Sequence, residues 1–305
     1  MSRDLYIKAN ASAKEWVRPS DWLSMPTNIT SADQIFVGLH AVIENSDNYC
    51  AFSFTTSTGQ YQVDWGDGTV TLHNSNTIAQ KNYDYASISN STICSRGYKQ
   101  VIIKVTPVSG NLLTCNFQQR FVTTPAQNQA YSSGFLECIL SMPNASSGGS
   151  ITFGGITIRH AYCEKVDIKT IGNATSMINM FYNCYSLQSV PLFNTINVTN
   201  MAYMFQNCVS LNFIPAFITT AVTTDFTTFA NGSTSINRIL MSFNRTVSLQ
   251  NCQLSKDALV EILTNLIDRT TTTSATIDIT GNWGATALTS ADRLIATNKN
   301  FTIVG

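Results

Sequence analysis

Charged residues are scarce in this sequence of 305 amino acids. Aspartate, glutamate, lysine and arginine make up 12% of the chain, about half of the usual share of ~25%. Eighteen basic residues balance eighteen acidic ones, so the formal net charge is zero. The chain therefore has no basic field that would attract nucleic acid. Weak self-repulsion also favours a protein that works within an assembly.

Long apolar runs are also missing. No stretch reaches the roughly 18 apolar residues that a membrane-spanning helix needs, so we expect no membrane insertion. Residues 1–23 contain no apolar core of the kind found in secretory signals. We therefore expect a protein that is made in the cytoplasm of its producing cell.

Motifs for catalysis and for cofactor binding are absent as well. The only histidines are His40, His73 and His160, and none lies in a nucleophile motif or at zinc-like spacing. The glycine-rich segment 148–155 lacks the lysine and the following helix of a phosphate loop. We expect no enzyme, no cofactor and no metal. A pair of carboxylates that hydrolyses polysaccharide stays open, because sequence distance does not determine spatial distance.

The eight cysteines form no C-x-x-C pair. In a chain without a secretory signal we expect them to be reduced and mostly buried. One or two disulfides stay open as an alternative.

Residues 31–125 carry the pattern of short β-strands separated by turns. Apolar and polar residues alternate, or β-formers dominate, in four segments, and such a series predicts an antiparallel sandwich. The segments are Tyr49–Thr56, Tyr61–His73, Lys99–Gly110 and Leu112–Val122.

The segment VDWGDGT, residues 63–69, is the sharpest local motif. Gly66 and Gly68 allow positive φ, and Trp65 is large enough to fill part of a core. Asp64 and Asp67 can accept hydrogen bonds from turn amides. A calcium ion on the two aspartates is the alternative. This motif resembles the strand and turn of polycystic-kidney-disease (PKD) type immunoglobulin-like domains.

A second motif occurs twice at an interval of 24 residues. Residues 179–187 read NMFYNCYSL and residues 203–211 read YMFQNCVSL. A fixed period of this length predicts stacked coils, each contributing the same side chains to a continuous core. The predicted core residues are Met180, Phe181, Cys184, Leu187, Met204, Phe205, Cys208 and Leu211.

The two repeated cysteines allow three interpretations. Residues one coil apart lie about 5 Å from each other in such a stack, so Cys184 and Cys208 could bind a metal or form a disulfide. The favoured interpretation is packing, with cysteine as a small apolar plug. The repeat closely resembles BspA-type leucine-rich repeats over residues 173–215. That resemblance implies a bacterial surface protein or a bacteriophage virion protein.

The two ends of the chain differ from the rest. Residues 1–30 form an irregular arm, whose Trp16 and Trp22 either fold back on the chain or dock on another subunit. Residues 254–305 predict helix, strand, helix and strand, with Ser255 as the first helix cap, and would close the last coil. The apolar segment Phe135–Pro143 is expected to be the edge strand of the stack.

The predicted fold is therefore mainly β. A docking arm (1–30) precedes an immunoglobulin-like sandwich of PKD type (31–125), a leucine-rich-repeat solenoid (126–253) and an α/β cap (254–305). We expect a structural protein on the surface of a tailed-phage virion, as capsid decoration, head fibre or tail component. Its partners would be capsid or tail subunits. A second copy of the chain and a host glycan or protein stay open as partners. A bacterial cell-surface adhesin and a polysaccharide-degrading enzyme are the alternatives.

Overall fold

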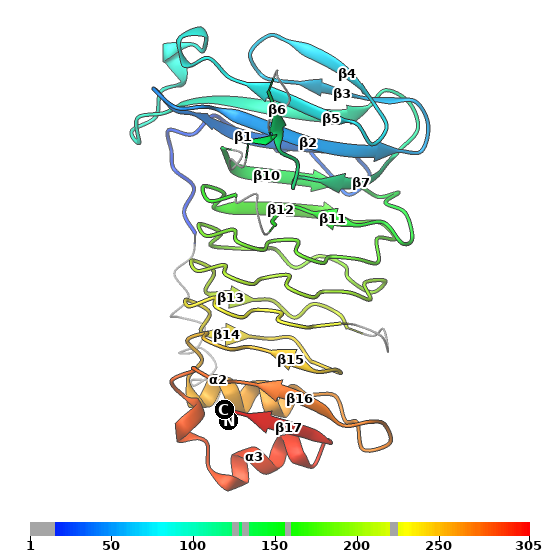
Figure 1. Ribbon diagram of the computed structural model, residues 1–305, viewed down its shortest axis with the longest axis vertical. Coiled ribbons are helices and arrows are strands. Elements are labelled where there is room, and N and C mark those ends of the chain that lie inside the picture. Colours follow the sequence, from blue (N-terminus) through cyan, green and yellow to red (C-terminus); the bar gives the residue numbers. More distant parts are fainter. Residues whose placement is uncertain (1–15, 124–127, 130–133, 156–159, 220–224) are drawn as a thin grey trace.

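Two β-sheets packed face to face occupy one end of the molecule, a stack of coils fills the middle, and two helices lie at the other end (Figure 1). This computed structural model describes residues 16–123, 128–129, 134–155, 160–219 and 225–305. The molecule is mainly β. None of the helices in these ranges is long and apolar enough to cross a membrane.

The larger sheet has six strands in the order β12-β10-β1-β6-β3-β4. Neighbouring strands are antiparallel except β10 and β12, which are parallel. The bounds are β1 Ile35–Val42, β3 Gln60–Asp64, β4 Val70–Asn74, β6 Lys99–Pro107, β10 Phe135–Ser141 and β12 Lys165–Thr170.

The smaller sheet has four strands in the order β11-β7-β2-β5. Aromatic rings fill the space between the sheets. The ring centroid of Phe36 on β1 lies 6.3 Å from that of Phe52 and 6.1 Å from that of Phe54, both on β2. A two-stranded ribbon, β8 with β9, follows β7 in the chain. The bounds are β2 Tyr49–Thr56, β5 Ile78–Asn82, β7 Leu112–Asn116, β8 Phe121–Val122, β9 Asn128–Gln129 and β11 Ile151–Thr152.

Strand β10 corrects one expectation. Its residues were expected at the edge of the stack, but β10 pairs with β1 on one side and with β12 on the other. All seven of its residues are buried, which explains the continuous apolar run. The sheet thus crosses the expected boundary between residues 125 and 126, and one hydrophobic core runs from Phe36 to Phe301.

The coils below β12 are held together by backbone hydrogen bonds at alternate residues. Phe181 N–H donates to Met204 O at 2.9 Å, and Phe205 N–H donates to Phe229 O at 2.8 Å. Intervening amides close short turns within a coil, as Cys184 N–H does with Phe181 O at 3.0 Å. This alternation satisfies the buried backbone without long strands.

Regular strands in the coils are short. Where the coils pair, single parallel bridges such as Ser176 with Asn200 replace a ladder. The reason is backbone conformation, because Asn183 and Asn207 have φ of 60° and 58°, outside the β region. The short parallel strands of this part are β13 Phe213–Ile214, β14 Arg238–Ile239 and β15 Val247–Ser248.

The C-terminal end follows the predicted order of helix, strand, helix and strand. Helix α2 (Lys256–Asn265) begins at Ser255, whose side chain accepts a hydrogen bond from the Ala258 amide. Strands β16 (Ala275–Asp278) and β17 (Phe301–Val304) extend β15 into a parallel sheet. Helix α3 (Ser290–Thr297) lies between them in sequence. The buried face of α2 covers the core at the end of the stack.

Candidate functional site

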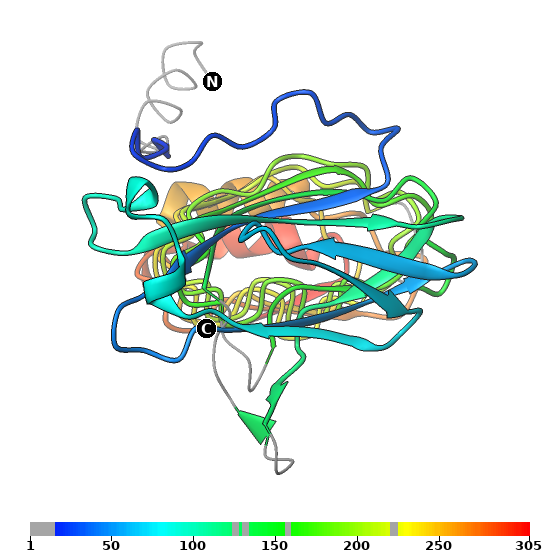
Figure 2. The same cartoon turned by 90° about the horizontal axis from the view of Figure 1, so that it is seen from above.

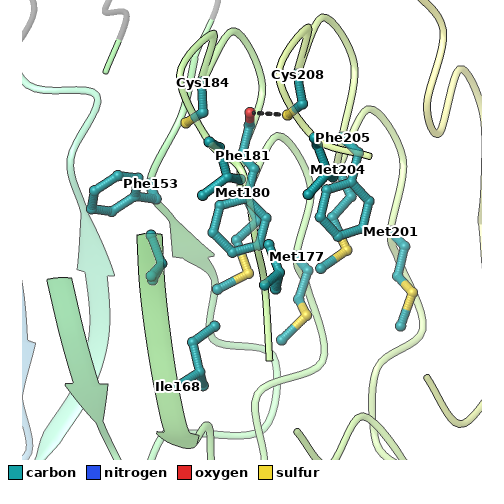
Figure 3. Packing of buried hydrophobic residues seen from close by; sticks show 14 of the residues in the cluster. Phe153, Ile168, Met177, Met180, Phe181, Cys184, Met201, Met204, Phe205 and Cys208 are labelled. Carbon is teal, nitrogen blue, oxygen red and sulfur yellow. Dashed lines mark hydrogen bonds between the residues drawn. The ribbon is translucent and has the colours of Figure 1, made fainter. Parts of the chain in front are cut away.

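The repeated motif lines the core of the stack (Figure 3). The rings of Phe181 and Phe205 stack with centroids 5.4 Å apart and planes 15° apart. Cys184 and Cys208 lie one coil apart and are fully buried, as the repeat predicts. The Cys208 Sγ–H donates to Phe181 O at 3.0 Å. Met180, Leu187, Met204 and Leu211 are buried in the same core.

The surroundings of the cysteines favour the packing interpretation over chemistry. All eight cysteines are free and buried. Burial raises the pKa of the Cys184 and Cys208 thiols well above the ordinary value. The thiolate is the form that binds metals and attacks electrophiles, so these thiols stay in the unreactive form. In the described part of the chain, no three His, Cys, Asp or Glu side chains gather as a metal site would require.

The next coil shows what this position requires. There the chain is one residue longer, and Ser233 occupies the buried place of the cysteine. Its hydroxyl accepts from Cys208 N–H at 2.9 Å and donates to Phe205 O at 2.5 Å. In the following coil, Cys252 Sγ–H donates to Ala230 O at 3.3 Å. In these three coils the position therefore holds a small side chain that donates a hydrogen bond, whether thiol or hydroxyl.

The repeated asparagines form a side-chain ladder beside the core. Asn207 Nδ2 donates to Asn183 Oδ1 at 2.9 Å, and Asn183 Nδ2 donates to Gly155 O at 3.0 Å. Further along, Asn231 Nδ2 donates to Gln250 Oε1 at 3.0 Å, and the Gln250 amide donates to Asp278. Amides with both donor and acceptor groups can repeat in this way along a stack. The ladder holds successive coils in register.

The motif at residues 63–69 makes the turn between β3 and β4. Gly66 and Gly68 have φ of 75° and 87°, and a Cβ on Gly66 would lie 2.4 Å from Ile102 O, so no other residue fits there. Asp64 accepts from the Gly66 amide at 3.0 Å, while Asp67 accepts from the Thr69 amide at 3.1 Å.

Two partners fix the rest of this turn. Trp65 is buried, and its Nε1–H donates to Thr71 Oγ1 at 2.8 Å. Asp67 forms an ion pair with Lys81. The hydrogen bonds of Asp67 to Thr69 and this ion pair together hold the pKa of its carboxyl below the ordinary value, against the opposing effect of burial. Both carboxylates therefore stabilise the turn, through hydrogen bonds to its amides and, for Asp67, the ion pair with Lys81.

The arm folds back on its own chain, which is the first of the two arrangements expected from the sequence. The side chain of Trp22 is only 3% exposed, and its Nε1–H donates to Tyr98 Oη at 3.0 Å. Trp16 packs beside it, with ring centroids 6.2 Å apart, and donates to Glu164 Oε2 at 3.1 Å. The apolar outer face of the larger sheet explains this, because Leu39 and Leu136 of that face pack in the same cluster as Trp22. Figure 2 shows the arm passing over the sheet.

Ion pairs that the sequence pattern did not reveal hold the arm. Arg18 pairs with Glu137 of β10 at 2.6 Å, and Glu137 is nearly buried. Glu164 receives both the Trp16 indole and the Arg96 guanidinium. Each charge comes from a different segment, so no spacing in the sequence could have indicated the cluster. The arm thereby connects the two-sheet part to the first coil.

Two histidines are enclosed between the sheets and the stack. Burial lowers the pKa of His40 to about 3 and that of His160 to about 4. His40 Nε2 accepts from Gly134 N–H at 2.9 Å, whereas His160 lies against Phe153 with ring centroids 4.4 Å apart. Both rings are therefore neutral and structural at physiological pH.

Comparison with known protein families gives a match over the stack. The family described as "Mycoplasma protein of unknown function, DUF285" matches residues 155–258, which include both copies of the motif and most of the stack. This match is compatible with repeats of the BspA type. No curated protein and no solved structure matches this chain.

Proposed function

We propose that this chain is a structural protein exposed on the surface of a tailed-phage particle, as capsid decoration, head fibre or tail component. In this proposal the two packed sheets are an immunoglobulin-like module of PKD type, and the coils are a BspA-type leucine-rich solenoid with an α/β cap. The main observation in support of this proposal is that the module and the stack are structurally continuous. The larger sheet includes strands of both parts, and one hydrophobic cluster extends through both.

Three further features support a rigid, passive scaffold. The thiols are buried, as are His40 and His160, so the groups most suited to catalysis are locked in packing roles. The asparagine ladder and the alternate backbone bonds stiffen the coils along their axis. The surface is polar with few charges, and the net charge is zero, which suits close neighbours in an assembly.

Location is the first test. Purified particles of the phage whose genome encodes this chain are analysed by mass spectrometry, and their surface is mapped by cryo-electron microscopy. The proposal expects stoichiometric copies with the stack resolved outside the shell or along the tail. Absence of the chain from purified particles would reject it.

A cell-surface adhesin that binds host protein or polysaccharide is the second candidate. It is favoured by one observation, the match of the stack to a family described from Mycoplasma. Antibody labelling of intact producing cells separates the two candidates, since only the adhesin places the chain on uninfected cells. Release of oligosaccharides from host capsule by the purified protein would instead favour the polysaccharide-degrading alternative.

A further inference from the structure

Strand β4 is an open edge of the larger sheet. At the opposite end of the larger sheet β12 continues into the coils, and in the smaller sheet β11 does the same. The outer edge of β5 is met by the β8 segment, where Gln80 exchanges side-chain hydrogen bonds with the Val122 backbone at 2.9 and 3.0 Å. Among the described residues, β3 is the sole strand that pairs with β4.

The backbone of β4 presents free pairing groups outward. Trp65 N–H donates to Thr69 O at 3.0 Å at the start of the hairpin. Because hydrogen-bonded and non-bonded pairs alternate in an antiparallel ladder, Thr71 and His73 then bond to β3. The N–H and C=O groups of Val70 and Leu72 point away from β3, as a joining strand requires.

The side chains of β4 lack the usual protection of an edge. Natural edge strands carry charges, proline or a bulge that prevent pairing with another chain. The sequence VTLHN contains no proline, and its only ionisable residue is His73. Its register with β3 is regular, without a bulge. Val70 and Leu72 are 55% and 54% exposed and lie on one face of the strand.

We propose that β4 pairs with β4 of a second copy of this chain, antiparallel about a two-fold axis through Leu72. In that arrangement Leu72 meets Leu72 of the other copy, and Val70 lies opposite Asn74. The pairing would join two larger sheets into one continuous sheet of twelve strands. This inference rests on the exposed strand alone and holds whether or not the chain belongs to a virion.

Charge favours this orientation and this occupant. The Val70 end of the strand adjoins the turn with Asp64 and with Asp67, whose charge the ion pair with Lys81 offsets in part. The Asn74 end adjoins Ser75 and Asn76, which are uncharged. An antiparallel pair places each acidic turn beside a neutral one, while a parallel pair would bring the like-charged turns together. A second copy therefore meets the edge without repulsion.

The pairing should be weak and reversible. Two five-residue strands bury less than the ~1,200 Å² typical of stable complexes, so we expect a Kd at or above about 10 µM. Copies held close together on a surface would pair more readily, because their effective concentration is high.

Cysteine cross-linking of the full chain tests the geometry. Since the eight native cysteines are buried, a thiol introduced by Leu72→Cys is the reactive one. Mild oxidation should give a disulfide-linked dimer, as Cα atoms across such a pair lie about 5.5 Å apart. Leu192→Cys is the matched control, since Leu192 is a leucine on the stack that is 62% exposed. Cross-linking of L72C no faster than L192C overturns the proposal.

Sedimentation velocity across a concentration series tests the energetics. The unmodified chain should show a reversible dimer, and Leu72→Lys should weaken it at least about tenfold, because two like charges then face each other on the axis. Leu192→Lys should leave the dimer unchanged. A chain that stays monomeric throughout, as when the edge receives a strand of a different protein, overturns the proposal, and so does an L72K variant that dimerises normally.

Discussion

At the scale of single residues, the stack uses each side chain for its size and its hydrogen-bonding capacity. The position filled by Cys208 is filled by Ser233 in the next coil, and both donate to a carbonyl of the preceding coil. From Cys208 onward the shared feature of this position is therefore a hydrogen bond in a small space, and the thiol is one way of making it.

Substitution of Cys208 tests this role. Cys208→Ser should lower the free energy of unfolding by about 1 kcal/mol or less, because the hydroxyl can make the same bond. Cys208→Leu should cost roughly 1–3 kcal/mol, because the tightly packed coil has no room for the larger side chain. Urea unfolding at neutral pH measures both. Equal losses for serine and leucine would contradict a role in packing.

The buried histidines predict acid sensitivity. Their folded-state pKa values, about 3 for His40 and about 4 for His160, lie below the unfolded value of ~6.5. The unfolded chain therefore binds more protons, and stability is lost as pH falls from about 6.5 towards 4. The loss at pH 4 is roughly 3 kcal/mol for each ring.

The variant His160→Phe isolates this effect from that of the carboxylates. Phenylalanine suits the aromatic surroundings of residue 160 and does not titrate. Urea unfolding at pH 7, 5 and 4 should show a smaller acid loss for H160F than for the unmodified chain, whereas His73→Asn, at a partly exposed site, should change the acid loss less. Parallel pH profiles for H160F and the unmodified chain would refute the assignment.

At the scale of elements, the arm contributes more than its sequence indicates. Residues 16–34 contain no strand or helix, yet they cover the outer face of the larger sheet with two tryptophans. Arg18 and Trp16 reach acidic residues on β10 and just before β12. The arm is thus a strap across the junction between the two-sheet part and the stack.

Trp22→Ala should release this strap locally. Loss of a buried tryptophan costs about 3–5 kcal/mol, which is more than the Arg18 ion pair or any single remaining hydrogen bond of the arm contributes. The Leu23 amide, which donates to Gln100 Oε1 at 3.0 Å, should then exchange its hydrogen much faster, while amides of β6 stay protected. Val17→Ala is the control, since Val17 is 79% exposed. An unchanged hydrogen-exchange rate of the Leu23 amide in W22A would show that contacts other than those of Trp22 hold the arm.

At the scale of the whole molecule, the continuous core predicts cooperative unfolding. The hydrophobic cluster extends from the aromatic layer between the sheets to the last strand, and β10 with β12 carry the hydrogen bonding across the junction. Two domains joined by a linker would unfold separately, whereas shared strands couple them.

Calorimetry of two distant variants tests the coupling. Trp65→Ala, between the sheets, and Phe243→Ala, near the cap, each remove a buried ring. Both should shift one common transition to lower temperature, each by about 3 kcal/mol or more in stability. Two transitions, with each variant moving a different one, would show that the two-sheet part and the stack are independent domains.

The repeat and the local motifs were sufficient for much of this description. The 24-residue period predicted that Phe181 stacks on Phe205 and that both cysteines are buried, because the repeated sequence gives each coil the same local conformation. The glycines and aspartates near Trp65 specified their turn for a similar reason. The cap order followed from helical spacing and from Ser255.

Only the tertiary structure decided how distant segments meet. The pairing of β1 with β10 joins residues about a hundred positions apart, and the arm's tryptophans bind a sheet face whose strands are scattered along the sequence. The open edge of β4 is likewise visible only once its neighbours are placed. Local patterns fix turns, periods and buried faces, because these depend on a few adjacent residues. Contacts between remote segments depend instead on complementary surfaces that exist only after the chain has folded.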